Sequence, residues 1–202
     1  MKIAIFIEPS VKNLRMISKW KELVNKEFGH QKYLDHPAHS TLAVFDLKKK
    51  IDSSFFEKLE DKIFTFKRFN LTISKSSIFY KDPLTKGDTL HYIIKSNKNL
   101  IHLQKIILIH FKDIEKNLIK NQKYSNKKFD NNYKKYGFPF VGKDWIPHFT
   151  IASIRSTIKK KEKFIKRFLM DKILHKLFTV KYISVWHISG NKHKKIFEYN
   201  LK

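Results

Sequence analysis

Two short segments, about a hundred residues apart, carry the side chains best suited to chemistry. His39 is followed after one residue by Thr41. His148 is followed in the same way by Thr150. Each segment runs into apolar, β-branched residues that predict a buried strand. Side chains at i and i+2 of a strand point to the same face, about 6–7 Å apart along it. Each histidine and its threonine should therefore share a face.

These four side chains suit phosphoryl chemistry. Imidazole titrates near neutral pH, so it can act there as an acid or as a base. Threonine hydroxyls can hydrogen-bond phosphoryl oxygens and stabilise their charge. If the two strands lie side by side, both imidazoles and both hydroxyls converge on one cavity of phosphate size. No carboxylate cluster with metal-ligand spacing stands near either motif, so we expect no metal and no cofactor.

The composition indicates an ordinary globular protein. The chain has 202 residues, of which 42% are hydrophobic, so it can bury a real core in one large domain or two small lobes. It contains no cysteine, which excludes disulfides and thiolate metal sites. We see no signal-peptide pattern and no apolar run long enough to span a bilayer. We expect a soluble, cytoplasmic monomer.

The formal net charge of +25 points to a polyanionic partner. RNA or an oligonucleotide is the first candidate, and an anionic membrane surface is the second. Only four of the 43 basic residues are arginine, and the chain is rich in Asn, Ile and Phe. An AT-rich genome that drifted toward lysine codons explains the charge equally well. Because bidentate phosphate recognition favours arginine, the lysine excess favours diffuse attraction over specific contacts.

The first half of the chain reads as strand, helix, strand, helix, strand. Ser10 is a suitable cap for a helix, and Gly29 is a suitable stop. We expect strands over residues 2–8, 39–47 and 70–80, the last whole or broken, and helices over residues 11–28 and about 53–66. A turn-rich joint follows, with Asp82-Pro83 and Lys86-Gly87-Asp88.

The same order recurs in the second half. We expect strands over residues 89–95 and 148–154, a helix from Asn97 or Asn99 to about 117, and a helix from Thr157 or Lys159 to about His175. A closing hairpin over residues 178–188 and 196–201 should turn at residues 189–191. The repeat predicts an α+β fold in one bilobal domain. Its two pseudo-symmetric lobes each carry a small, mostly antiparallel sheet with helices on the outer face, and the active-site cleft lies between them. The lobes cover about residues 1–86 and 87–202, and the terminal strands can cross between them.

One segment breaks the symmetry. Residues 118–139 are polar, rich in Asn and Lys, and interspersed with aromatic residues. We interpret them as an inserted loop. Lysines alternating with aromatic side chains suit a stacking surface for unpaired bases. An insertion without any role is an equal alternative.

At the two motifs the chain resembles the two-histidine phosphoesterase superfamily, which contains the bacterial 2′,5′ RNA ligase-like proteins, now mostly viewed as RNA 2′,3′-cyclic phosphodiesterases. The matching residues are His39-Ser40-Thr41-Leu42 and His148-Phe149-Thr150-Ile151, with Pro147 before the second histidine. The first strand and the last two strands also resemble those of the family. The insertion and the lysine content depart from the family pattern, which leaves the substrate open.

The resemblance implies a metal-independent hydrolase. By analogy, His39 is the proton donor, His148 is the proton acceptor, and Thr41 and Thr150 bind the phosphate. The substrate is an RNA 2′,3′-cyclic phosphate end, a 2′,5′-linked oligonucleotide or a cyclic oligonucleotide. RNA end joining is the reverse reaction. A non-catalytic, basic RNA-binding protein on the same fold is the alternative.

Other candidates have simpler interpretations. His36 is close enough to the first motif to reach the pocket rim, but it reads more simply as a histidine of a surface loop. Trp145 reads as packing at the lobe interface rather than as a base-stacking residue. His187-Ile188-Ser189 repeats the short motif but leads into Gly190, so we assign it to the closing turn. The runs Lys48–Lys50 and Lys159–Lys161 are interpreted as solvated.

Overall fold

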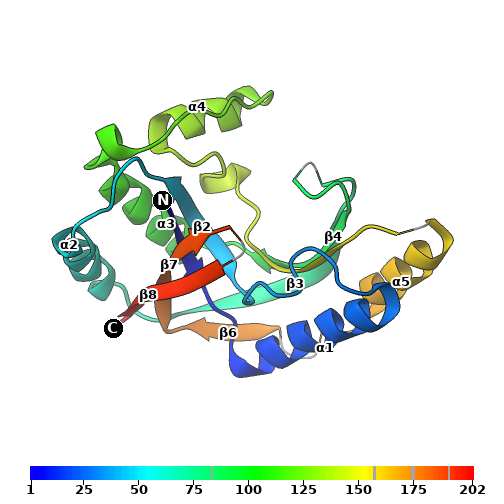
Figure 1. Cartoon of the computed structure of the whole chain (residues 1–202). Helices are drawn as coiled ribbons and strands as arrows, with labels where there is room; N and C mark the ends of the chain where they lie inside the picture. Colours follow the sequence, from blue (N-terminus) through cyan, green and yellow to red (C-terminus); the bar gives the residue numbers. More distant parts are fainter. Residues whose placement is uncertain (83, 157, 174–175, 191) are drawn as a thin grey trace.

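The computed structural model describes residues 1–202 except 83, 157, 174–175 and 191 (Figure 1). The strands are β1 (Lys2–Ile7), β2 (Ser40–Asp46), β3 (Phe69–Phe79), β4 (Asp88–Lys95), β5 (His148–Ile154), β6 (Leu177–Val180), β7 (Tyr182–Ser189) and β8 (Lys192–Asn200). The helices are α1 (Val11–Phe28), α2 (Ser53–Phe64), α3 (Lys98–Lys112), α4 (Lys127–Tyr136) and α5 (Ile158–Met170). Short 3-10 turns cover Glu115–Asn117 and Gly142–Asp144.

The described strands form two four-stranded antiparallel sheets, in the orders β2-β1-β7-β8 and β5-β4-β3-β6. This confirms the predicted α+β class. The sheets do not follow chain order, since β3 precedes residue 86 yet pairs with β4, and β7 from the C-terminal region pairs with β1. Sheet membership is thus set by pairings between distant parts of the chain.

The predicted strand over residues 178–188 is wrong in one respect, because it is two strands. β6 pairs with β3 in the second sheet, and β7 pairs with β1 in the first. The chain crosses between the sheets at Lys181, the single residue between β6 and β7. A continuous apolar run cannot reveal such a crossing, because its halves differ only in the distant strands that they contact.

Helices cover one face of each sheet (Figure 1). On the first sheet, Phe45 of β2 stacks on Phe111 of α3, with ring centroids 3.9 Å apart. On the second sheet, Tyr92 of β4 contacts Phe168 of α5, which in turn packs edge-on against Trp20 of α1. Dispersion and apolar burial thus hold the helices to the faces opposite the motif side chains.

The predicted helix over residues 11–28 is confirmed. The Ser10 hydroxyl accepts a hydrogen bond from the Asn13 N–H, and Gly29 follows the helix with a φ of 69°. The third helix, predicted to about residue 117, ends at Lys112 and is followed by a 3-10 turn. The helix predicted to end near His175 is described as far as Met170, and Thr157, His175 and Asn191 of the predicted boundaries lie outside the described residues.

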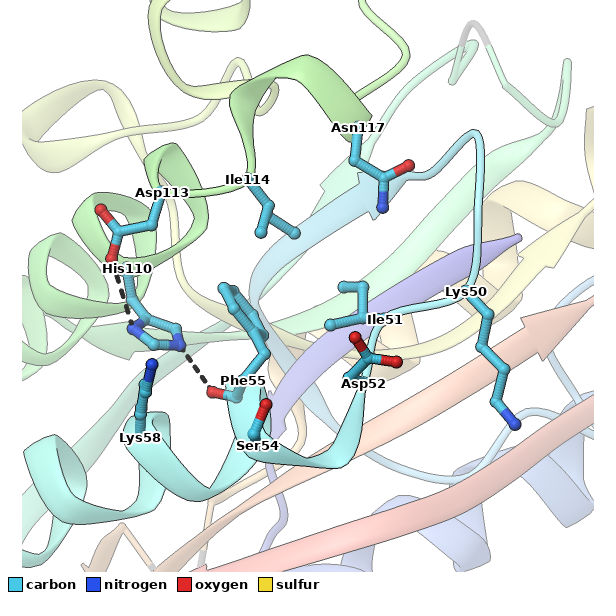
Figure 2. Close-up of a pocket in the computed structure, with 10 residues that line it drawn as sticks. All are labelled: Lys50, Ile51, Asp52, Ser54, Phe55, Lys58, His110, Asp113, Ile114 and Asn117. Carbon is cyan, nitrogen blue, oxygen red and sulfur yellow. Dashed lines mark hydrogen bonds and ion pairs between the residues drawn. The ribbon is translucent and has the colours of Figure 1, made fainter.

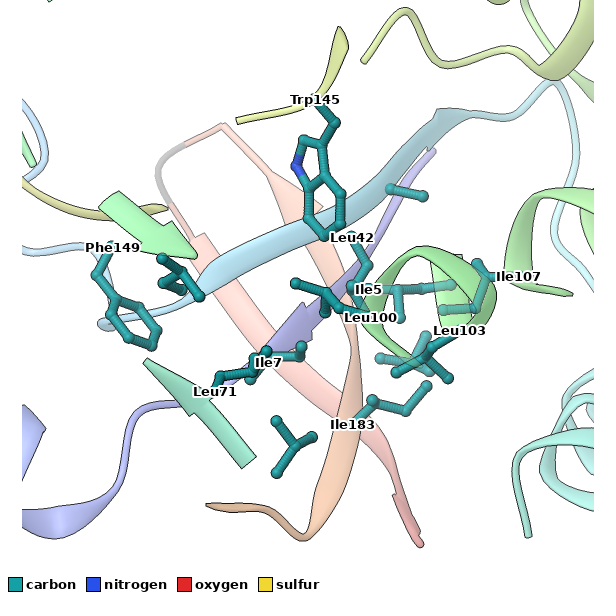
Figure 3. Packing of buried hydrophobic residues seen from close by; sticks show 14 of the residues in the cluster. Ile5, Ile7, Leu42, Leu71, Leu100, Leu103, Ile107, Trp145, Phe149 and Ile183 are labelled. Atoms are coloured by element: carbon teal, nitrogen blue, oxygen red, sulfur yellow. The ribbon is translucent and has the colours of Figure 1, made fainter. Parts of the chain in front are cut away.

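Apolar side chains from both sheets and from α3 form one core (Figure 3). Trp145 is only 7% exposed and packs there, which agrees with the predicted packing role. The buried Gln104 of α3 links the helix to β2 and to the segment before β5 by hydrogen bonds. Its amide nitrogen donates to the carbonyls of Leu42 and Phe140, and its amide oxygen accepts from the Gly142 N–H.

The insertion over residues 118–139 is not a plain loop, because it contains α4. The Asn126 side chain caps this helix, and Gly137 ends it in the left-handed conformation with a φ of 73°. Tyr133 is buried, and its hydroxyl donates to the Ile119 carbonyl. Caps and a buried aromatic residue thus give this polar segment a fixed structure.

No helix among the described residues is long and apolar enough to cross a membrane.

Candidate active site

The two motif strands present their residues in the predicted way. His39 lies immediately before β2, and His148 is the first residue of β5. His39 and Thr41 are half-buried, whereas Ser40 between them is fully buried. His148 and Thr150 repeat this alternation. Each histidine therefore shares a partly open face with its threonine.

β2 and β5 are the neighbouring edges of the two sheets. Each lies at the end of its sheet, and the two strands contact one another. The fold thus places the two motif strands side by side, although they belong to different sheets.

Both imidazoles are held in the same tautomer. The His39 Nδ1 lies 2.6 Å from the Pro37 carbonyl oxygen, and the His148 Nδ1 lies 2.7 Å from the Ile146 carbonyl oxygen. Because a carbonyl oxygen only accepts hydrogen bonds, each Nδ1 carries a proton and donates it. Each Nε2 is then left to accept or release a proton, and each ring is fixed by the backbone two residues before it.

Each motif strand carries one extra residue directly after its threonine. Ile5 and Phe6 of β1 pair with Ala43 and Thr41, so Leu42 of β2 is left over, and in the same way Ile151 of β5 is left over where His91 of β4 pairs with Thr150. Phe6 stacks on His39 with centroids 3.7 Å apart. His91 occupies the equivalent place in the second sheet, with its ring centroid 5.2 Å from that of His148. The two halves of the site are thus alike in backbone and unlike in this side chain.

His91 was not predicted to belong to the site. It is fully buried and stacks on Phe79, with centroids 3.8 Å apart. Its Nδ1 donates to the Thr89 carbonyl, and its Nε2 is buried without a described partner. Burial and, to a lesser extent, the charge of His148 lower its pKa to about 4. A lone polar residue inside the apolar strand from Leu90 to Ile94 was the available signal.

The surroundings of His39 are basic. Burial lowers its pKa to about 3, and His193, His36 and Lys21 act in the same direction, against the hydrogen bond to Pro37. His36 lies in the loop before β2, where it is half-buried and its ring packs 4.4 Å from that of His193. The reason is Lys21, whose ammonium donates to the carbonyls of Tyr33, Leu34 and His36 and folds this loop inward.

The surroundings of His148 include an acid. Burial lowers the pKa of His148, while the Ile146 carbonyl and the charge of Asp82 oppose this. Asp82 is itself buried, and its carboxylate accepts hydrogen bonds from the Thr89 hydroxyl and the Leu84 N–H. The sequence placed Asp82 in a turn and gave no sign of this role. The two catalytic candidates therefore differ in the sign of the charge beside them.

A hollow of about 400 Å³ lies between α2 and α3, away from the motif residues (Figure 2). Its buried His110 joins the helices, because Nε2 donates to the Phe55 carbonyl and Nδ1 accepts from the Lys62 ammonium. Asp52 and Asp113 also line it, so it does not favour anions. Across the part of the chain that is described, no group of three His, Cys, Asp or Glu side chains is placed to hold a metal ion.

The family model of the 2′-5′ RNA ligase superfamily matches residues 7–192. The chain belongs to this superfamily. No curated protein matches it by sequence. The match covers most of the chain, and membership supports a phosphoryl-transfer enzyme.

Solved structures show how far the fold is shared. TT0787 of Thermus thermophilus aligns with a TM-score of 0.69 at 9% identity, over 99% of this chain and 97% of that chain. E. coli LigT, solved with 3′-AMP, aligns with a TM-score of 0.56 at 16% identity, over 99% and 97%. A protein solved as a phosphoesterase aligns with a TM-score of 0.56 at 14% identity, over 99% and 97%. At these identities the likeness is one of fold.

Proposed function

We propose that this member of the 2′-5′ RNA ligase superfamily is a metal-independent phosphodiesterase. Its substrates are RNA ends with a 2′,3′-cyclic phosphate, or 2′,5′-linked or cyclic oligonucleotides. His39 and His148 supply general acid–base catalysis, and the hydroxyls of Thr41 and Thr150 hold the phosphate. The solved complex of LigT with 3′-AMP supports a nucleotide substrate.

The matched pair of imidazoles carries this proposal. Both Nδ1 atoms donate to a carbonyl oxygen two residues earlier, so both Nε2 atoms are available for proton transfer. Both histidines lie at the start of neighbouring edge strands and share a half-buried face with a threonine. His110, in contrast, uses both of its ring nitrogens in hydrogen bonds to other residues.

The reaction follows from these positions. The His148 Nε2 takes a proton from water as the water oxygen bonds to phosphorus. The bond from phosphorus to one sugar oxygen breaks, and that oxygen receives the proton from the His39 Nε2. The threonine hydroxyls donate hydrogen bonds to the non-bridging oxygens, on which negative charge develops.

The neighbouring charges support this order of roles. His148 becomes cationic as it accepts the proton, and Asp82 stabilises that charge. His39 becomes neutral as it donates, which burial and the charge of Lys21 favour. The carboxylate of Asp82 thus favours the cationic product state of the acceptor against the effect of burial, and the cations near the donor favour its neutral product state.

The test is hydrolysis of a 2′,3′-cyclic nucleotide and of 2′,5′-oligoadenylate in the presence of a metal chelator. We expect activity, and we expect His39→Ala and His148→Ala each to lower kcat by on the order of a hundredfold or more. His102→Ala, at an exposed position on α3, is the matched control. RNA binding without any hydrolysis by the folded protein would favour the non-catalytic alternative.

A further inference from the structure

A second cavity, of about 490 Å³, opens at the far end of β5. Its lining includes His30, Gln31 and Lys32 from the segment after α1, and Thr85, Ser153 and Arg155 from the β3–β4 turn and β5. Residues adjacent to both motifs therefore line the cavity, since residues 30–32 precede His39 and Ser153 and Arg155 follow Thr150.

The cavity continues the face on which the motif residues lie. Thr150 pairs with His91 of β4, and Ser153 pairs with Thr89, two residues before His91. Residues two apart in a strand share a face, so Ser153 lies on the side of Thr150. Because their partners lie two residues apart in β4, Thr150 and Ser153 are separated by about 7 Å along the strand. That is close enough for one extended oligonucleotide to reach both.

Hydrogen bonds hold the walls of the cavity in place. The Ser153 N–H donates to the Lys32 carbonyl, and the Ser153 and Thr85 hydroxyls lie 2.5 Å apart. The Arg155 N–H donates to the Gln31 side-chain oxygen. A Cβ at Gly87 would lie 2.9 Å from the Ile154 carbonyl oxygen, so the turn lies against β5 only because this residue is glycine. The site is therefore formed before any ligand arrives.

The cavity is basic, and a hydrogen bond fixes the orientation of its arginine side chain. The Arg155 Nε donates to the Thr85 carbonyl, which fixes the guanidinium plane and leaves its terminal nitrogens for another acceptor. Within the described residues no carboxylate pairs with Arg155 or Lys32, and Asp35 pairs only with His30. A planar guanidinium with free terminal nitrogens suits a phosphate.

We infer that this cavity binds the phosphodiester next to the reacting one, so that the substrate is an oligonucleotide rather than a mononucleotide. The inference rests on the proposed function and narrows it. Arg155 and Lys32 neutralise the second phosphate. Leu84, which is 83% exposed at the edge of the cavity, offers apolar surface to the adjoining sugar or base.

The experiment compares adenosine 2′,3′-cyclic phosphate with the dinucleotide that carries one further 5′ adenosine and therefore one internal phosphodiester. We expect the dinucleotide to have a kcat/KM at least about tenfold higher. Arg155→Gln should lower the ratio of the two kcat/KM values about tenfold, since one charge-assisted contact is lost. Arg15→Gln, an exposed arginine on α1, is the matched control and should keep the ratio.

A second variant tests the inference independently, in case Arg155→Gln fails to fold. The Lys32 side chain makes no hydrogen bond or ion pair in the described structure, so Lys32→Ala should fold normally and still lower the ratio several-fold. The preference for the dinucleotide should also weaken as salt is raised. Equal kcat/KM for both substrates, or ratios unchanged in both variants, would overturn the inference while the proposed function stands. No cleavage of either substrate would overturn the proposed function itself.

Discussion

Binding of a phosphate anion should draw a proton into the site. In the free protein the pKa of His39 is lowered from 6.5 to about 3. At 1.36 kcal/mol per unit, the buried site disfavours the imidazolium by about 5 kcal/mol. The attraction of an anion about 4 Å away stabilises the imidazolium by about 4 kcal/mol at an effective dielectric constant of about 20. That is about 3 pKa units, so the pKa of His39 in the complex should lie near 6.

The direction in which phosphate affinity changes with pH follows from these two pKa values. Between pH 4 and 6 the free imidazole is neutral and the bound one is protonated, so binding takes up close to one proton. The affinity should weaken by up to tenfold for each pH unit in this range and become nearly constant above it. The proton taken up is the one that His39 later donates.

NMR titration of the histidine ring protons measures this directly. Dimethyl phosphate is a suitable probe, because its charge does not change over the range. We expect its Kd to rise between pH 4.5 and 6, and the His39 resonance to titrate at higher pH in its presence. His39→Gln should remove this dependence and His102→Gln should not. A Kd that is constant with pH, or an unchanged His39 pKa, would refute the electrostatic account of the site.

Four further outcomes follow from particular contacts. Asp82→Asn should lower kcat about tenfold with little change in KM, because the charge beside the acceptor is lost; an unchanged kcat would contradict its role. Gly137→Ala should lower the free energy of unfolding by about 1–2 kcal/mol in urea titrations, since φ is 73° and the new Cβ lies 3.1 Å from the Leu118 side chain. Gln104→Leu should lower the free energy of unfolding by about 2–3 kcal/mol, because three backbone groups, one of them buried and two partly buried, lose their partner. Stability should fall as pH drops below 6.5, because the unfolded chain then binds a proton that the half-buried imidazole of His39 does not bind in the folded protein; a flat profile from pH 7 to 5 would exclude this.

Local patterns in the sequence determined much of this protein. The spacing of His39 and Thr41, and of His148 and Thr150, identified the strands and the faces on which these residues lie, because a strand has a period of two. The first helix was likewise readable from its apolar period and its caps. Such signals depend only on neighbours in the chain, so they survive without a tertiary structure.

The tertiary structure decided which distant residues surround the motif histidines. Phe6 lies beneath His39 and His91 beside His148 because β1 pairs with β2 and β4 pairs with β5, with Phe6 opposite Thr41 and His91 opposite Thr150. Asp82 approaches His148 through the fold of a turn. The crossing at Lys181 depends on strands more than a hundred residues away. These contacts depend on strand pairing and packing between distant parts of the chain, so a local sequence pattern cannot predict them.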